Sequence, residues 1–107
     1  AQGAINGRST RFVVDTGATM VSMGAGDASR MGIDWRKGQP GMVQTANGQV
    51  RAWRVLLDSV RVGEITINGV EGLVHESDLP VVLLGMSFLS RTEMRNEGTT
   101  MTLKKRF

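Results

Sequence analysis

Residues 11–20, RFVVDTGATM, run hydrophobic side chains directly into an acid. The Phe-Val-Val segment at 12–14 is typical of a buried β-strand. Asp15 follows it, although a carboxylate is costly to bury unless it is paired or hydrogen-bonded. Thr16 and Gly17 come next and favour a tight turn in which backbone groups can reach the carboxylate. The stretch therefore predicts either a structural Asp that caps a turn or an acid held in place for chemistry.

The composition fits one small globular domain that spans residues 1–107. Hydrophobic residues make up 40% of the chain and charged residues 21%, as in ordinary globular proteins. Many glycines and few prolines predict tight turns rather than long helices. No apolar run is long enough to cross a membrane, so we expect no membrane contact by this segment. Any signal or anchor would lie upstream of Ala1.

Residue usage disfavours several kinds of binding site. The chain has no cysteine and a single histidine, His75, which we expect on an exposed loop, so no metal site is expected. Gly24-Ala25-Gly26 lacks the third glycine of a dinucleotide-binding loop, and no organic cofactor is expected. The arginines are scattered from Arg8 to Arg106 with few aromatic neighbours, which disfavours nucleic acid as a partner.

Three Asn-Gly pairs punctuate the chain, and such pairs are the strongest short-range signal for a β-hairpin because both residues tolerate positive φ. They lie at residues 6–7, 47–48 and 68–69. Alternating hydrophobic residues flank each pair, so the chain is predicted to be mostly β. We expect the three turns to join 2–5 to 10–15, 42–46 to 49–57, and 60–67 to 73–74.

Two segments predict short helices. Residues 24–32 have apolar residues at helical spacing and end at Gly32, and residues 86–92 are the second candidate. The last stretch predicts a hairpin that turns at 96–98. Hairpin, hydrophobic strand, glycine and helix occur twice in this order, which makes VVLLG at 81–85 the structural partner of FVVDTG at 12–17.

The order of these features resembles that of the retropepsin-type aspartic proteases, in particular their single-domain bacterial members. The shared features are Asp15-Thr16-Gly17-Ala18 after a hydrophobic strand, a mid-chain hairpin, and Leu83-Leu84-Gly85 before a short helix. A D-T-G match alone is weak, but this order extends over nearly the whole chain. The resemblance implies a single-lobe, closed β-barrel-type domain with one or two short helices, active as a symmetric homodimer. It also implies an anchored bacterial protein that faces the periplasm.

The resemblance assigns roles to the matching positions. Asp15 corresponds to the catalytic aspartate, the Thr16 hydroxyl to the brace between the two active-site loops, and the Gly17 N–H to a group that holds the carboxylate. Residues 45–48 correspond to the tip of a flap that closes over substrate, and the Leu-Leu-Gly segment to the support beneath the catalytic loop. The substrate-binding positions that it implies are Ala18, Thr19, Met20, Thr45, Ala46, Asn47, Gly48 and Leu84.

The chain also departs from its viral relatives. Thr19 and Met20 stand where those enzymes carry acids that bind substrate, and Met86-Ser87 stands where they place an arginine that pairs with one of those acids. Viral substrate preferences therefore do not carry over. Ala18 replaces a hydroxyl residue and removes one hydrogen bond to the charged form of the acid pair, so we expect a mildly acidic pH optimum.

Aspartic proteolysis needs two adjacent carboxylates that share a proton and hold a water between them. The chain contains one D-T-G, so the second aspartate would be Asp15 of another copy, with the active site on the twofold axis. We therefore expect a homodimeric aspartic endopeptidase that acts on peptides or proteins without a cofactor. The alternative is a catalytically silent dimerisation or peptide-binding module that keeps D-T-G for its hydrogen bonds.

Overall fold

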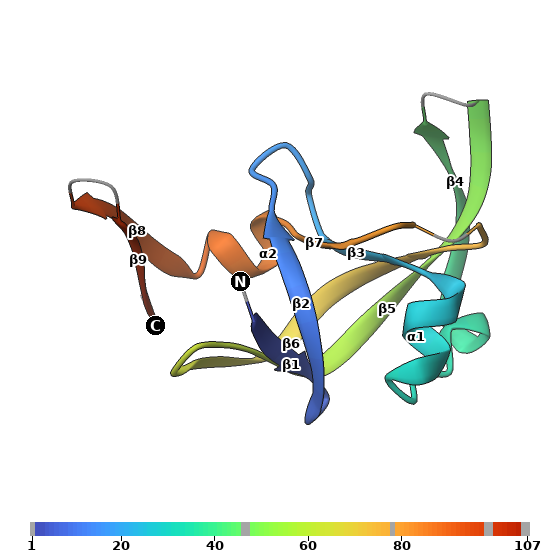
Figure 1. The fold of residues 1–107 in the computed structure, drawn as a ribbon. Helices are drawn as coiled ribbons and strands as arrows, with labels where there is room; N and C mark the ends of the chain where they lie inside the picture. The colour runs from blue at the N-terminus through green and yellow to red at the C-terminus, as the bar shows by residue number, and fades with distance from the viewer. Residues whose placement is uncertain (1, 46–47, 78, 98–99, 106–107) are drawn as a thin grey trace.

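The computed structural model describes residues 2–45, 48–77, 79–97 and 100–105, and it consists mainly of β-strands (Figure 1). The strands are β1 Gln2–Ile5, β2 Arg8–Val14, β3 Val21–Gly24, β4 Gln39–Thr45, β5 Gly48–Val62, β6 Ile65–His75, β7 Val82–Leu84, β8 Thr92–Glu97 and β9 Thr100–Lys105. The helical elements are α1 Ala25–Arg30, the 3-10 turn η1 Trp35–Lys37 and α2 Met86–Leu89. The mostly β prediction with two short helices is confirmed.

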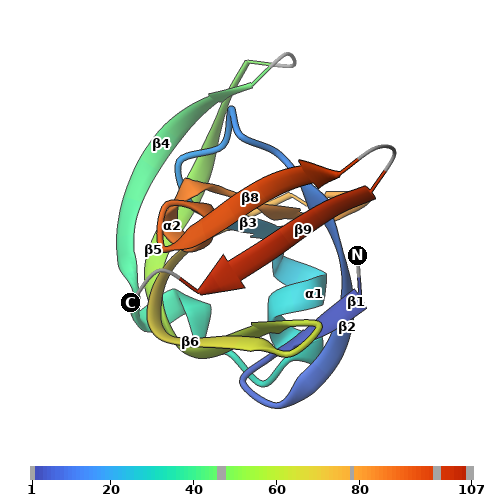
Figure 2. The same cartoon turned by 90° about the vertical axis from the view of Figure 1, so that its left-hand side faces the viewer.

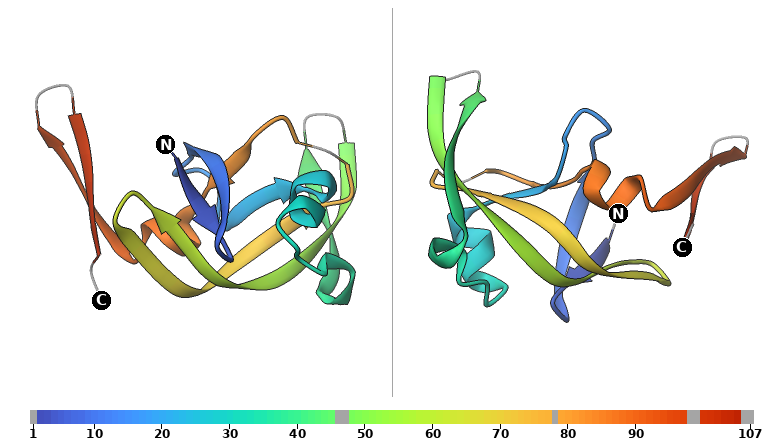
Figure 3. Two further views of the ribbon diagram at one scale, coloured as in Figure 1. Left: turned by 60° about the horizontal axis from the view of Figure 1, so that its bottom comes forward. Right: turned by 180° about the vertical axis from the view of Figure 1, so that it is seen from behind.

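Six of the strands close into a barrel. Hydrogen-bonded neighbours follow the order β1-β2-β7-β3-β6-β5, and β1 also pairs with β5, which completes the ring. In Figure 3 the two long strands β5 and β6 run side by side along the barrel. Within the described residues, β4 lies outside the ring and pairs with β5 alone. Closure removes the open strand edges that would otherwise invite association.

Alternate side chains of the barrel strands point inward and form a single core. Along β5 and β6 most buried positions carry aliphatic residues, and exposed positions carry mostly polar ones. Burial follows the period of two within short runs, such as 55–57, 60–62 and 70–74, and shifts by one residue between them. Helices α1 and α2 each add buried side chains to this cluster. The largest fully buried side chains include Phe12, Phe88, Ile5, Met23, Met31, Leu57, Ile67 and Leu84.

The first two predicted hairpins are present. Asn6 and Gly7 have φ values of 52° and 81° and join β1 to β2, as the type I′ turn of an Asn-Gly pair requires. The Asn6 carboxamide Oδ1 also accepts a hydrogen bond from the Ser59 backbone N–H at 3.2 Å, which ties this turn to β5. Strands β4 and β5 pair from Gln39 opposite Arg54 to Thr45 opposite Gly48, and the turn residues 46–47 lie outside the described residues.

The third predicted turn is wrong. Residues 68–69 lie inside β6, and the chain reverses instead at Gly63-Glu64, where Gly63 has a φ of 60°. A glycine with positive φ at the first central position fits a type II′ turn. This turn sets Val62 opposite Ile65, and further along the β5–β6 ladder it sets Val60 opposite Ile67 and Leu57 opposite Val70.

The prediction that residues 12–14 form a buried strand is correct for Phe12 and wrong for the two valines. Phe12 is 1% exposed, whereas Val13 and Val14 are 47% and 36% exposed. Strand β2 pairs in parallel with β7, and the register places Val13 opposite Leu83 and Val14 opposite Leu84. This pairing confirms that the segment at 81–85 is the structural partner of the segment at 12–17.

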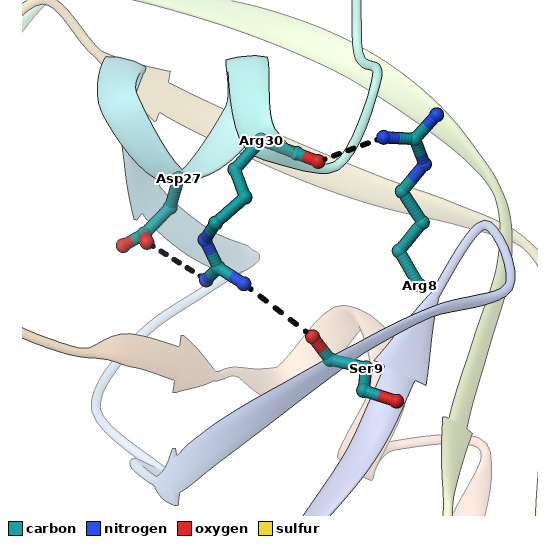
Figure 4. A network of polar contacts seen from close by, with 4 residues as sticks. All are labelled: Arg8, Ser9, Asp27 and Arg30. Atoms are coloured by element: carbon teal, nitrogen blue, oxygen red, sulfur yellow. Dashed lines mark hydrogen bonds and ion pairs between the residues drawn. The ribbon is translucent and has the colours of Figure 1, made fainter.

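Helix α1 begins after Gly24 and is followed by Gly32, whose φ of 73° ends it as predicted. A polar network fastens the helix to the first hairpin (Figure 4). The Arg30 guanidinium pairs with Asp27 at 3.0 Å and donates to the Ser9 carbonyl at 3.5 Å, while Arg8 donates to the Arg30 carbonyl at 3.0 Å. The network holds α1 against β2.

Strands β8 and β9 form a separate two-stranded sheet that extends away from the barrel in Figure 1 and faces the viewer in Figure 2. The predicted terminal hairpin is therefore present, but the turn predicted at 96–98 is wrong for its first two residues. Asn96 and Glu97 are strand residues that pair with Met101 and Thr100, and Gly98 lies outside the described residues. No helix among the described residues is long and apolar enough to span a membrane.

Candidate active site

Asp15 lies where two parallel strands end. Its backbone N–H donates to the Leu84 carbonyl at 3.1 Å and so extends the β2–β7 ladder by one bond. The chain then turns at once, because the Ala18 N–H donates back to the Asp15 carbonyl at 3.2 Å. The position of the acid is therefore fixed by the backbone on both sides of it.

The Asp15 carboxylate accepts a hydrogen bond within the same turn. The Gly17 N–H donates to Oδ1 at 2.9 Å, and the carboxylate is partly exposed. A Cβ at Gly17 would lie 3.2 Å from the same oxygen, so glycine lets the backbone approach the acid closely. Oδ2 receives no hydrogen bond from any residue that the structure describes. The carboxylate thus keeps one oxygen free for a ligand.

The loop at residues 15–20 rests on the start of α2. The Met86 N–H donates to the Ala18 carbonyl and the Ser87 N–H to the Thr19 carbonyl, both at 2.8 Å. Gly85 leaves no room for a side chain, because a Cβ there would overlap the Met20 carbonyl and approach the Ala18 oxygen to 2.8 Å. This close backbone packing explains why glycine ends the Leu-Leu-Gly segment.

Ser87 adds a side-chain connection beneath the same loop. Its hydroxyl donates to the Glu71 carbonyl on β6 at 2.7 Å and accepts from the Val21 N–H on β3 at 3.1 Å. Val21 is fully buried, so this backbone N–H depends on the hydroxyl for its hydrogen bond. Ser87 therefore joins strands β3 and β6 under the loop.

A cleft of about 610 Å³ opens between the Asp15 loop and the β4–β5 hairpin. In Figure 1 both segments rise from the same side of the barrel. The lining residues come from the loop, from β3 and β4, from the facing sides of β5, β6 and β7, and from the segment before β7. They are Gly17, Ala18, Thr19, Met20, Ser22, Gln39, Pro40, Gly41, Met42, Val43, Gln44, Ala52, Arg54, Leu73, His75, Leu79 and Leu83.

The predicted site residues are distributed unequally around this cleft. Residues 17–20 line it as expected, while Asp15 is half-buried just beyond the lining and Thr16 is exposed. Of the predicted flap tip, residues 46–47 and the side chain of Thr45 lie outside the description, and Gly48 begins β5. The preceding β4 residues Met42, Val43 and Gln44 contribute the hairpin's part of the lining.

Leu84 does not reach the cleft. Its side chain is fully buried in the core, whereas that of the preceding Leu83 lines the cleft. Because neighbouring side chains of a strand point to opposite faces, only one of the two leucines can face a ligand. The side chain of Leu84 therefore cannot make the substrate contact that was expected of it. Its backbone carbonyl nevertheless supports the Asp15 loop by accepting from the Asp15 N–H.

His75 and Arg54 are cleft residues that the sequence did not reveal. The prediction of an exposed loop at His75 is wrong: the residue ends β6 and pairs with Ala52 and Gly24. Its buried Nδ1 has no hydrogen-bond partner among the described residues, and desolvation by burial lowers the pKa of the imidazole below its usual value. A correct β5–β6 register would have revealed both residues, because alternate positions of these strands face the cleft.

Exposed valines surround the acid on the outer side. Val13, Val14 and Val81 are 47%, 36% and 39% exposed, and all three belong to or adjoin the paired strands β2 and β7. The described residues contain no group of three His, Asp or Glu side chains that would bind a metal ion. The two strands that lead to the Asp15 loop therefore carry exposed apolar side chains.

The sequence matches the family model described as gag-polyprotein putative aspartyl protease over residues 1–91. An uncharacterized protein in the cobV 5′ region of Sinorhizobium sp. is 35% identical over 97 residues, which cover 84% of this chain and 40% of that protein. The uncharacterized protein RP867 of Rickettsia prowazekii (strain Madrid E) is 35% identical over 88 residues, covering 81% and 38%. The chain thus spans about two fifths of the length of these curated relatives.

Solved structures share the fold. The crystal structure of a retropepsin-like aspartic protease from Rickettsia conorii matches with a TM-score of 0.81 and 32% identity, covering 98% of this chain and 80% of that one. The EIAV protease complexed with the inhibitor HBY-793 matches with a TM-score of 0.69 and 23% identity, covering 84% and 83%. The chain therefore belongs to the gag-polyprotein putative aspartyl protease family and has the retropepsin-like fold.

Proposed function

We propose that two copies of this chain hydrolyse peptide bonds with a water held between their Asp15 carboxylates. The observation that carries the proposal is the Asp15 turn, in which the Gly17 N–H holds Oδ1 at 2.9 Å beside a cleft of about 610 Å³. A surface Asp that only capped a turn would not need a loop fastened to α2 by two backbone hydrogen bonds. Membership of an aspartyl protease family supports the same conclusion.

The chemistry follows from placing two like charges together. One carboxyl of the pair keeps its proton, because both cannot ionise at close range, and it polarises the substrate carbonyl. The other carboxylate takes a proton from the water as the water oxygen attacks the carbonyl carbon. The leaving amine is then protonated, and the pair returns to its shared-proton state.

The second carboxylate must come from another copy, because the chain has one D-T-G sequence. The exposed Val13, Val14 and Val81 side chains beside the acid favour the same arrangement. Burying a valine side chain fully contributes roughly 1.5–3 kcal/mol, so a twofold contact here would be favourable. In that dimer the exposed Thr16 lies at the seam, and residues 17–20 with Met42 form the substrate walls.

Asp15→Asn tests the acid, and Asp58→Asn is the matched control because Asp58 is an exposed acid on β5 outside the cleft. We expect Asp15→Asn to lower the cleavage rate of a diverse peptide mixture at least about a hundredfold between pH 4 and 7, since a positioned acid–base group contributes on that scale. Asp58→Asn should cleave like the native chain, with a mildly acidic optimum. Circular dichroism would verify that each variant is folded.

Equal cleavage by the native chain and Asp15→Asn would refute the assignment of the acid. A folded, dimeric native chain that cuts nothing would favour the peptide-binding alternative. Dilution tests the second copy: the rate per chain should fall once the concentration drops below the dimer dissociation constant. A rate per chain that stayed constant while the chain became monomeric would contradict the shared site.

A further inference from the structure

One wall of the cleft is built from facing positions of β5 and β6. Ala52 and Arg54 point into the cleft from β5, and Leu73 and His75 point into it from β6. The register places Arg54 opposite Leu73 and Ala52 opposite His75. Arg54 and His75 are therefore diagonal neighbours on one face, at a spacing of roughly 7–8 Å. The small Ala52 side chain leaves the space between them open.

The charge on this wall is unbalanced. Arg54 makes no hydrogen bond or ion pair through its guanidinium with any described residue. No described residue that lines the cleft is an Asp or Glu. Glu76, the acid next to His75 in the chain, lines a second pocket on the opposite side of the sheet together with Arg51 and Trp53. A guanidinium on a wall whose described residues include no acid attracts an anionic ligand group.

His75 contributes a donor rather than an acceptor. Its buried Nδ1 finds no partner in the part of the chain that the structure describes, and an unpaired buried N–H is less tolerable than an unpaired acceptor. This favours the neutral tautomer that carries its proton on Nε2, the nitrogen on the other side of the ring. Since His75 lines the cleft, the Nε2–H is the group available to a ligand.

We propose that Arg54 and His75 form a subsite for the carboxylate side chain of a bound peptide, a Glu or an Asp. In this subsite the carboxylate lies over Ala52. It accepts one hydrogen bond from the Arg54 guanidinium and another from the His75 Nε2–H. Leu73 packs against the aliphatic part of the side chain. The proposal rests on the proposed peptide substrate and adds its chemical class.

The test measures binding to Asp15→Asn, so that no peptide is consumed. The probes are fluorescent octapeptide mixtures in which one position is fixed as Glu or as its neutral isostere Gln and the others are randomised. At one fixed position we expect Glu mixtures to bind about fivefold more tightly, the scale of a partly exposed ion pair. Adding Arg54→Gln should abolish this preference, and adding His75→Phe should reduce it.

Arg51→Gln is the matched control, because it removes the same charge from the same strand on the opposite face. It should keep the preference for Glu. Equal affinity for Glu and Gln mixtures at every position, a preference that survives Arg54→Gln, or no binding at millimolar concentration would each overturn the subsite. A preference that Arg51→Gln abolishes would overturn it as well, because the effect would then come from overall charge.

The single histidine provides an independent readout. Its Hε1 resonance can be followed by NMR through a pH titration of Asp15→Asn. Bound Glu mixtures should raise the pKa of His75, since a nearby carboxylate favours the imidazolium, and Gln mixtures should not. The same pKa with both mixtures would exclude His75 from the subsite.

None of these binding measurements depends on peptide cleavage. The proposed hydrolysis and the proposed subsite can therefore be refuted independently of each other. A native chain that never cuts, together with an Asp15→Asn form that prefers Glu, would refute the hydrolysis and keep the subsite. A native chain that cuts Glu and Gln peptides equally well, with no preference in binding, would refute the subsite and keep the hydrolysis.

Discussion

The loop at residues 15–20 and the β4–β5 hairpin face each other across the cleft, and they are fastened very differently. The loop is joined to β7 and α2 by backbone bonds from Asp15, Met86 and Ser87, and a side chain at Gly85 would disturb it. Strand β4 pairs with β5 alone within the described residues, and Met42 on it is 59% exposed. The loop is thus hydrogen-bonded to two other elements, whereas β4 is hydrogen-bonded to one strand.

This difference assigns separate tasks to the two walls. A loop with several independent hydrogen bonds keeps the acid in one position, which general acid–base chemistry requires. A hairpin with a single ladder and little buried apolar surface belongs to the part of a protein that opens at low free-energy cost. Substitutions that probe packing should therefore have large effects under the loop and small effects on the hairpin.

The largest expected effect is that of Gly85→Ala. The new methyl group would overlap the backbone at Met20 and Ala18, so we expect a loss of about 3 kcal/mol or more in the free energy of unfolding. Gly41→Ala on β4 is the control, because a Cβ there meets nothing within 4 Å; its stability should stay within about 1 kcal/mol of the native chain. Urea unfolding at fixed protein concentration measures both. Similar losses in the two variants would contradict the comparison.

An intermediate effect is expected for Ser87→Ala. The substitution removes the bond to the Glu71 carbonyl and leaves the buried Val21 N–H without a partner, which costs roughly 1–3 kcal/mol. Ser90→Ala, an exposed serine at the end of α2, should change the free energy of unfolding by less than about 0.5 kcal/mol. If Ser87→Ala were as stable as Ser90→Ala, the hydroxyl would not support the loop.

The smallest expected effect concerns His75 and pH. Burial lowers the pKa of the folded imidazole, so below the unfolded pKa of about 6.5 the unfolded chain binds the proton more readily. The native chain should therefore lose stability relative to His75→Phe as the pH falls from about 6.5 to the lowered folded value, and the difference should then level off. Paired unfolding curves between pH 7.5 and about pH 4 measure it. A difference that is independent of pH would contradict the burial of the imidazole.

The sequence predicted the order of elements well, because local signals and long-range packing agree there. The Asn6-Gly7 turn, the end of α1 at Gly32 and the partnership of β2 with β7 all follow from turn chemistry and hydrophobic runs. At Asn68-Gly69 the two kinds of signal disagree. The turn at Gly63 sets Val60 opposite Ile67 and Leu57 opposite Val70, and this buried register prevails over the local preference of the Asn-Gly pair.

The candidate site could be predicted where a sequence motif identifies a residue. It could not be predicted where the answer depends on which side of a strand a side chain points to. Residues 17–20 line the cleft as their place after the D-T-G acid implied. The choice between Leu83 and Leu84 depends on the pleat of β7, which three hydrophobic residues in a row do not reveal. His75 and Arg54 were missed for a related reason. The turn predicted at residues 68–69 gave β5 and β6 the wrong register, so the residues that share the cleft face could not be identified.

The support beneath Asp15 has a consequence for how the protein comes to be folded. The hydroxyl of Ser87 and the N–H of Val21 are 66 positions apart in the chain, and β2 pairs in parallel with a strand that is made late. Contacts of such high sequence separation form slowly, since the long intervening loop must close first. A chain emerging from the ribosome as far as β6 already contains the acid but lacks Leu84, Met86 and Ser87, whose groups join its loop to β7 and α2. The Asp15 loop therefore cannot reach its final, supported structure until α2 has been synthesised.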